Sequence, residues 1–560
     1  MPISSAPTGV TSATYDPLFV DVLVGDDAAV GDGTTDDTVA LQSFLTAAAD
    51  TGATVLLGVH KITATLTVPS GVMVMGRDDD SRLILPADAD FPALTLDAVT
   101  RTRVNRLRVT AAATGAIGAC AVEVSGDSVD VVLEDVHADG TYEGFRIVGN
   151  QGATAGTIER IHLVRCKVSD SDLYGFRVED VDGAYLTDCT SDVTGLDGVK
   201  LLRSARNVSI TGGSFAGAVA GDGLDAYAGG GRLTIQGTIF SNNTLNGIVI
   251  KNDDLNLSDP ATYGRVQDVT IMGVQATGNG GAGLTIHRQS ATDNTDEPLV
   301  CRVSVQGGQF DNNTQYGIFI RARQVTVSGA TVARNGYDGI AVDDGALDVS
   351  LIGCHVAGNS TSGATSYDGI RVEGDRVQII GGSSIGADPD GATSDTDISN
   401  GTKNQRYGLR VEATASDVFI AGIALLHNAT GALSDASLAA VTLPYAASAT
   451  SSNIIIPNNN RYYCRDAAGT AASVAYYTTG DALNIGDSTN AEAINFLANG
   501  TATMFPKLAC VGEVEIDGAL NHDGSTVGFY GTAPVAKQTG VAVSAAGVHA
   551  ALVALGLISA

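Results

Sequence analysis

One short pattern recurs through the middle of the chain and limits the possible folds more than any other feature. A glycine is followed by an apolar residue, any residue and a second apolar residue, as in EGFRI, YGFRV and NGIVI. Spacings between successive copies range from 22 to 39 residues. A minimum spacing with a variable excess is typical of a constant unit that carries loop insertions. The glycines of the ten copies are Gly144, Gly175, Gly198, Gly223, Gly247, Gly283, Gly317, Gly339, Gly369 and Gly408.

Each copy predicts a short, half-buried strand, because apolar and polar residues alternate. A second alternating pattern follows, for example NVSITGGSF from Asn207. Such short strands bury a face only when turns stack in parallel and equivalent apolar positions form one continuous core. Helical solenoids are excluded because no window has a sustained helical period, and leucine-rich repeats because their Leu/Asn pattern is missing. The sequence therefore predicts an all-β fold with a parallel β-helix over residues 105–430.

Asparagines at a constant offset support this winding. Asn243, Asn279, Asn313 and Asn335 each lie four residues before the repeat glycine. In stacked turns their side chains form a ladder, in which each amide bonds to the turns above and below. Asparagine also favours turns by itself, but a fixed offset in four copies favours the ladder.

The segment before the repeats predicts a helix followed by strands. Asp36, Asp37 or Thr38 begins the helix and Gly52 ends it. Strands are expected at 53–58, 62–68 and 72–76. The apolar face of the helix consists of Leu41, Phe44, Leu45 and Ala48.

The stretch GDGTTDDT (31–38), the amphipathic helix, the strand GATVLL and the turn VPSGVMVMG together resemble the N-terminal cap of the pectate-lyase-like superfamily, which includes bacteriophage tailspikes. With the repeats, the resemblance covers roughly residues 15–430. It implies a right-handed parallel β-helix whose open end is closed by the cap helix. It implies no reaction, because lyases, hydrolases, epimerases and adhesins share the fold.

The repeats stop near residue 427, and the following segment is rich in Ala, Ser and Thr. Residues 521–539 resemble a stretch near the C-terminus of many phage tail and fibre proteins, next to assembly modules. The last residues predict a short helix that packs as a homotrimer. The expected organisation is an N-terminal arm (1–14), the cap and first turns (15–104), the β-helix (105–430), a linker (431–453), a small β-rich assembly domain (454–539) and the C-terminal helix (540–560).

Charge and composition exclude several functions. The chain has 32 basic and 62 acidic residues, a net charge of −30, so it lacks the basic surface that nucleic acids need. No apolar run reaches membrane-spanning length and no secretory signal begins the chain, so we expect synthesis in a host cytoplasm without membrane insertion. The seven cysteines form no metal-binding spacing, and no cofactor or metal is expected.

Candidate catalytic residues come from one outward-facing position of the predicted strands. The residue four positions after each glycine lies at the same height in every turn, and neighbouring turns are about 4.8 Å apart. Asp343 and Glu373 are therefore expected to be neighbours, with Asp344 as an alternative carboxylate. Paired carboxylates suit glycoside hydrolysis, and we expect hydrolysis rather than elimination, because no lyase arginine motif is visible.

The same column and the adjoining turns supply candidate binding residues for a glycan. Basic side chains suit an acidic glycan, and tyrosines near the repeat glycine offer aromatic faces for sugars. A surface ion ladder and tyrosines that merely pack a corner remain the simpler alternatives. The candidate binding residues are Lys251, His287, Arg288, Arg321, Arg323, Tyr316 and Tyr337.

The sequence thus predicts a tailspike-like minor tail protein of a phage virion that binds a host surface polysaccharide and other tail proteins, with Asp343 and Glu373 as a depolymerase pair. A non-catalytic adhesin or structural virion component is the first alternative. A free polysaccharide lyase is the second.

Overall fold

The computed structural model describes most of the chain between residues 19 and 437 and a few segments beyond. Two compact units, Met1–Ile454 and Ile455–Ala560, are considered separately. The described residues are 19–23, 29–111, 117–149, 158–227, 231–252, 266–288, 300–387, 404–437, 461–465, 471–477, 483–485, 526–527, 535–536, 540–555 and 557–558.

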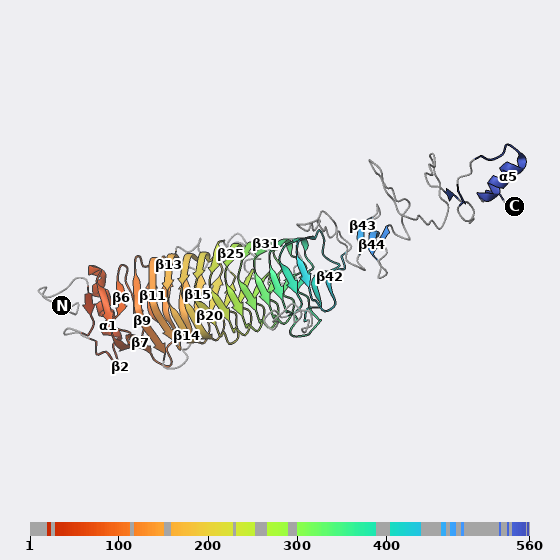
Figure 1. Ribbon diagram of the computed structural model, residues 1–560. Coiled ribbons are helices and arrows are strands. Elements are labelled where there is room, and N and C mark those ends of the chain that lie inside the picture. Colours follow the sequence, from red (N-terminus) through yellow and green to blue (C-terminus); the bar gives the residue numbers. More distant parts are fainter. Residues whose placement is uncertain are drawn as a thin grey trace. The chain divides into compact units, whose positions relative to one another are not determined.

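The first unit is a coil in which every turn contributes one strand to each of three parallel faces (Figure 1). Face I holds the Gly-apolar-x-apolar repeats. Its strands are β5 (Leu66–Thr67), β8 (Pro92–Asp97), β10 (Cys120–Ser125), β12 (Glu143–Val148), β15 (Phe176–Glu179), β18 (Val199–Leu202), β21 (Leu224–Ala226), β24 (Ile248–Asn252), β27 (Leu284–Arg288), β30 (Ile318–Ile320), β33 (Ile340–Val342), β36 (Ile370–Val372), β39 (Tyr407–Val411) and β42 (Gly431–Asp435).

Face II holds the second sequence pattern. Its strands are β1 (Phe19–Asp21), β3 (Thr54–Leu57), β6 (Met73–Gly76), β13 (Ile158–Val164), β16 (Val181–Thr187), β19 (Arg206–Thr211), β22 (Leu233–Gln236), β25 (Gln267–Met272), β28 (Cys301–Gln306), β31 (Arg323–Ser328), β34 (Leu347–Ile352), β37 (Asp375–Ile380) and β40 (Phe419–Ala421). The longer strands β9 (Arg103–Ala111) and β11 (Val129–Asp139) pair on faces II and III.

Face III completes each turn with short strands. They are β2 (Asp32–Asp36), β4 (Val59–Lys61), β7 (Arg82–Leu85), β14 (Lys167–Ser171), β17 (Thr190–Thr194), β20 (Ser214–Ala216), β23 (Ile239–Ser241), β26 (Gln275–Thr277), β29 (Gln309–Asp311), β32 (Thr331–Ala333), β35 (His355–Ala357), β38 (Ser383–Ile385) and β41 (Ala424–Leu426).

The core is a column of buried aliphatic side chains with stacked phenylalanines inside it. Phe145 lies against Phe176 with ring centroids 5.1 Å apart, and Phe215 lies against Phe240 at 5.7 Å. Such stacking follows from the in-register pairing of equivalent positions, for example Phe145 with Phe176. The described cysteines are buried free thiols, at positions Cys120, Cys166, Cys189, Cys301 and Cys354.

The predicted asparagine ladder is present at the corner between faces III and I. Asn243 Nδ2 donates to Asn279 Oδ1 at 3.0 Å, and Asn279 donates likewise to Asn313 at 2.9 Å. The ladder continues through Asn335 and extends beyond the predicted members. The additional members are Asn359, Gln405 and Asn428.

The N-terminal cap has the predicted helix, α1 (Thr38–Thr51), which buries the predicted apolar face and ends at Gly52 in a left-handed conformation. Asp37 precedes the helix but makes no side-chain capping bond. Its carboxylate instead accepts hydrogen bonds from the backbone N–H groups of Val30 and Gly31 and from the buried ring of His60. The strand expected at 62–68 is limited to Leu66–Thr67.

The coil extends past the expected boundary at residue 430, because β42 pairs with β39 on face I. In the second unit, β43 (Arg461–Arg465), β44 (Ala471–Tyr477) and β45 (Leu483–Ile485) form an antiparallel sheet. A small pair, β46 (Thr526–Val527) and β47 (Val535–Ala536), and the helix α5 (Ala545–Ala554) follow. The expected arm at 1–14 and most of the linker (438–453) lie outside the described residues. Over the described ranges, no helix is long and apolar enough to cross a membrane.

The ladder predicts a large loss of stability when one member is truncated. Asn313 is buried, donates to Asn335 and to the carbonyl of Ala276, and accepts from Asn279. Because Asn313→Ala leaves several buried groups unpaired, we expect a loss of about 3 kcal/mol. Denaturant unfolding measures it, with the exposed neighbour variant Thr314→Ala as control. Equal stability of the two variants would contradict a structural role for the ladder.

Candidate functional site

The outer surface of face I carries two columns of side chains, because alternate residues of each strand point away from the core. Ile286 and Ile320 pair inside the coil, while Lys251 and His287 pair on the outside. The outward column predicted from the sequence therefore exists. Its members lie four residues after each repeat glycine and include Glu179, Tyr227, Lys251, His287, Arg321, Asp343, Glu373 and Glu412.

Asp343 and Glu373 meet at the ends of β33 and β36, as the pairing of Val342 with Val372 requires. Asp343 Oδ2 lies 2.7 Å from Arg321 Nε, and its Oδ1 lies 3.8 Å from Arg371 Nη2. Arg371 also forms an ion pair with Glu373. The side chains of Asp343 and Glu373 are 14% and 25% exposed, so both are accessible from solvent.

The two carboxyl groups have opposite pKa shifts. Burial, together with hydrogen bonding and repulsion from Glu373, raises the pKa of Asp343 to about 6. Burial opposes the ionised form of Glu373, but hydrogen bonding to Arg371 and its positive charge lower the pKa of Glu373. Divergent pKa values within one pair assign a proton donor and a proton acceptor. In this pair, Asp343 holds a proton more readily than Glu373 does.

The two carboxyl groups follow paired residues on adjacent turns. Each shifts the pKa of the other. Retaining glycosidases hold their carboxyl groups about 5 Å apart and inverting enzymes farther, with the sugar between them. Asp343 and Glu373 follow residues that pair on adjacent turns, about 4.8 Å apart, which is nearer to the retaining than to the inverting separation. The expected hydrolysis therefore stays a prediction.

Other predicted residues divide between this pair and different places. Asp344 is exposed, and it contributes through its backbone: its carbonyl accepts from Arg321 Nε at 3.0 Å and its N–H bonds to Glu373. Arg323 lies on face II, with Nε 3.7 Å from Asp348, and does not join the pair. The side chain of Arg288 lies outside the described residues. His287 is half-buried beside Lys251.

The predicted tyrosines form an aromatic ladder along the adjoining edge of face I. Tyr316 and Tyr337 have ring centroids 5.4 Å apart in an edge-to-face contact, and Tyr337 and Tyr367 stack at 4.5 Å. Tyr316 also hydrogen-bonds to Arg371, which contacts both carboxylates of the pair, while burial raises the pKa of Tyr316. The aromatic ladder and the carboxylate pair are thus one continuous surface.

The structure reveals a second carboxylate cluster on face I that the sequence analysis did not single out. Ligand-type oxygens of Asp197, Asp222 and Asp225 all lie within 4.8 Å of one another. Lys200 Nζ lies 2.5 Å from Asp225 and 3.1 Å from Asp197, and Lys251 Nζ lies 3.2 Å from Asp225. Because ammonium groups already occupy the space between the carboxylates, this arrangement is an ion-pair network rather than a cation site.

Burial governs the chemistry of this cluster. It raises the pKa of Asp222 to about 6, with help from the charge of Asp225. The ammonium groups of Lys200 and Lys251 lie 4.4 Å and 4.3 Å from the centroid of the Tyr227 ring. The segments TGLDGVK and GDGLDAY could have predicted this cluster. An aspartate directly precedes the repeat glycine in both segments, and in the second segment another aspartate lies two residues after it. With exposed fractions of 7% and 5% for the Asp197 and Asp225 side chains, the cluster is less accessible than the Asp343–Glu373 pair.

The raised pKa of Asp222 predicts a pH-dependent stability. An acid with a higher pKa in the folded state binds its proton more tightly there, so stability falls as pH rises from about 4 through about 6. Asp222→Asn stays neutral and should be more stable at pH 8, by on the order of 1–3 kcal/mol. At pH 4 the two proteins should be alike. In contrast, Asp225→Asn leaves two buried lysines without their partner and should lower the melting temperature; the reverse ranking would contradict this account.

Comparison with known proteins agrees with the fold. Residues 121–298 match the family described as "Right handed beta helix region", whereas no curated protein sequence matches. Among solved structures, the A-module of mannuronan C-5 epimerase from Azotobacter vinelandii is 16% identical, with a TM-score of 0.43 over 76% of this chain and 100% of that chain. The Dettilon tailspike protein is 17% identical, with a TM-score of 0.42 over 76% of this chain and 71% of that one.

The catalytic unit of a GH87 α-1,3-glucanase from Streptomyces thermodiastaticus is 14% identical, with a TM-score of 0.44 over 79% of this chain and 70% of that one. Values of this size do not transfer an activity from one chain to another. The family match and the three-faced parallel coil agree, however, on the architecture. The coiled part of this chain is a right-handed parallel β-helix.

Proposed function

We propose that the protein is a polysaccharide depolymerase whose substrate lies on face I. Asp343 is the general acid and Glu373 the general base. The observation that carries this proposal is one solvent-accessible carboxylate pair with opposite pKa shifts. A donor with a pKa near the working pH transfers protons efficiently in both directions.

The reaction that fits this pair is β-elimination at a hexuronate. Glu373 takes the proton from C5, the C5–H electrons form the C4–C5 double bond, the bond from C4 to the glycosidic oxygen breaks, and Asp343 protonates the departing oxygen. Both groups act from the same side, as their contact allows. Arg371, in contact with both side chains, holds Glu373 ionised and is positioned near the substrate carboxylate.

One feature indicates where the polymer lies. The aromatic ladder Tyr316–Tyr337–Tyr367 continues from the carboxylate pair along successive turns, and aromatic faces favour stacking of sugar rings. The alternative function, a non-catalytic adhesin, uses the same surface but no proton transfer. It is favoured by the ion pairs of Asp343 and Glu373, which by themselves describe an ordinary ion ladder.

The proposed location is a phage tail, where the protein assembles as a homotrimer and meets host surface polysaccharide. The resemblance of residues 521–539 to phage tail proteins supports the location. Helix α5 supports self-association, because none of its residues is buried and Val548 is 48% exposed. Residues 540–560 contain no Asp, Glu, Lys or Arg in a chain of charge −30, so copies meet there with least repulsion.

The catalytic proposal predicts loss of activity in two isosteric variants. Asp343→Asn cannot donate a proton and Glu373→Gln cannot accept one, so each should reduce turnover by about 10²–10⁴-fold. Wild-type activity should fall as pH rises above about 6, where Asp343 loses its proton. The measurement is ultraviolet absorbance of unsaturated product from polygalacturonate, alginate and hyaluronan.

Glu412→Gln is the matched control, since Glu412 occupies the same column one turn beyond Glu373 and pairs with Arg410; it should keep full activity. If new reducing ends form without unsaturated product, the reaction is hydrolysis and not elimination. No cleavage of any uronate polymer or host envelope glycan would favour the adhesin.

The assembly proposal predicts that removing residues 540–560 converts trimers to monomers, because the exposed apolar helix is then absent. Light scattering of the full chain and the shortened chain measures the mass. Val548→Asp should have the same effect by placing a charge on α5. An unchanged mass in both variants would contradict self-association through this helix.

A further inference from the structure

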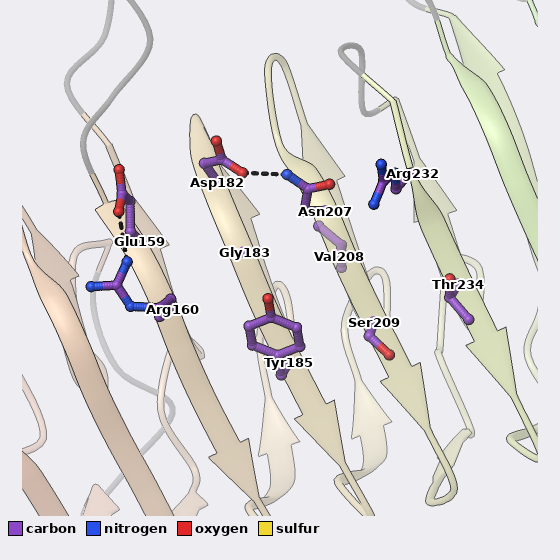
Figure 2. A pocket seen from close by; sticks show the side chains of 10 residues that line it. All are labelled: Glu159, Arg160, Asp182, Gly183, Tyr185, Asn207, Val208, Ser209, Arg232 and Thr234. Atoms are coloured by element: carbon purple, nitrogen blue, oxygen red, sulfur yellow. Dashed lines mark hydrogen bonds and ion pairs between the residues drawn. The ribbon is translucent and has the colours of Figure 1, made fainter.

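A groove of about 470 Å³ lies on the outside of face II, away from the carboxylate pair on face I. Strands β13, β16, β19 and β22 form it, and the side chains that line it are visible in Figure 2. Its lining is polar except for the ring of Tyr185 and the aliphatic Val208. Neither the predicted site nor the proposed catalytic mechanism uses any of these residues.

The groove exists because a regular column of side chains is interrupted. At the corner that begins each face II strand, one residue per turn has a positive φ, and successive residues lie one above the next. Asp130 pairs with Arg160 at 2.6 Å, and Asp268 pairs with Arg302 at 2.6 Å. Gly183 and the short Asn207 stand between these pairs. The column consists of Asp130, Arg160, Gly183, Asn207, Arg232, Asp268 and Arg302.

Gly183 exposes the ring of Tyr185. A Cβ at position 183 would lie 3.4 Å from the Tyr185 hydroxyl and 3.5 Å from the ring edge, so any side chain would cover it. On the neighbouring turn His162 stacks on Tyr185 with centroids 4.7 Å apart and planes 16° from parallel, which holds the tyrosine ring in place. On the following turn the equivalent position is Ser209. His162 therefore covers one face of the Tyr185 ring, and the small Ser209 leaves the other face open toward the groove.

Arg232 supplies a positive charge at the end of the groove. Its guanidinium forms no hydrogen bond or ion pair within the described residues, although its charge acts on Asp268 of the next turn. In contrast, Asp182 is already engaged, through Arg206 at 3.0 Å and Asn207 at 2.5 Å. Figure 2 shows Arg232 across the groove from Arg160, which is paired with Glu159. Among the described residues, an anionic group that enters the groove therefore meets one guanidinium without a carboxylate partner.

We propose that this groove is a second, non-catalytic saccharide-binding site that takes an acidic sugar. The pyranose ring rests against Tyr185, its carboxylate meets Arg232, and its hydroxyls exchange hydrogen bonds with Asp182, Asn207 and Ser209. Aromatic rings bordered by polar side chains and one arginine provide both ring contact and charge recognition. Arg160 and Arg232 are three turns apart, roughly 14 Å, which accommodates a short oligosaccharide.

The groove site shares one assumption with the proposed function, namely that the glycan contains uronates. Binding in the groove does not require catalysis at Asp343. A polymer held on face II while another segment is processed on face I would raise the effective concentration of substrate at the catalytic pair. A chain that binds but does not cleave would retain this site.

Binding to short probes tests the proposal independently of cleavage. Saturation-transfer NMR and calorimetry would be recorded on the full chain carrying Asp343→Asn, so that probes stay intact. The probes are tetramers of galacturonate, mannuronate and guluronate, with neutral maltotetraose for comparison. We expect at least one acidic tetramer to bind, and maltotetraose to bind at least 10-fold more weakly.

Variants then place the binding in the groove. Arg232→Gln should weaken acidic-tetramer binding at the groove about 10-fold or more. Ser209→Leu, which fills the groove without changing the strand backbone, should remove one of the binding sites that calorimetry counts, whether or not a site on face I remains. The control Arg302→Gln removes the equivalent arginine two turns away and should have no effect. Glu373→Gln, in the proposed catalytic pair, should leave the groove site intact, so that any change it causes is assigned to face I. Absence of binding by all acidic tetramers, or full binding by folded Ser209→Leu, would overturn the proposal.

Discussion

Everything in this protein depends on one constraint: successive turns of the backbone hydrogen-bond in parallel and in register. A residue's nearest neighbours are then the residues at the same position one turn above and below, about 4.8 Å away. Apolar positions make a continuous core, as Phe145 and Phe176 do. Buried amides satisfy one another along a ladder, as Asn279 and Asn313 do. Outward-facing side chains form columns, and the chemistry of each side chain depends on the residues at the same position one turn above and below.

Charge along these columns explains which surface positions differ from their surroundings. Several acidic side chains stack beside a basic one, such as Asp268 beside Arg302, and this exposed pair contributes little to stability. Asp343 beside Glu373 is different, because two carboxyl groups lie next to each other, and Arg371 together with hydrogen bonds from its neighbours favours the ionised form of Glu373. Because the two side chains lie in one column, their pKa values shift in opposite directions. Such perturbed pKa values are common at sites of proton transfer.

Where a column of side chains is interrupted, the result is an open space on the surface rather than a shifted pKa. At Gly183 the absence of a side chain opens a groove in an otherwise continuous corner and exposes the Tyr185 ring. The carboxylate pair lies on face I and this groove lies on face II. A long glycan could therefore contact the coil at both without the two segments competing for the same residues.

Periodicity alone was sufficient to predict the winding, the ladder from Asn243 to Asn335 and the placement of Asp343 and Glu373 on adjacent turns, because each depends only on position within the repeat. The buried face of α1 followed separately, from the spacing of apolar residues in the cap helix. Asn359 escaped prediction because an insertion separates it from Gly369, and Gln405 because it is a glutamine that lies three residues before Gly408 instead of four, although both amides join the ladder. Only the tertiary structure decided how side chains share space. It placed Arg371 between two carboxylates, drew Asp197, Asp222 and Asp225 around Lys200, and put Arg323 on another face. Repetition specifies which residues are neighbours, whereas rotamers, charge partners and missing side chains determine what those neighbours do.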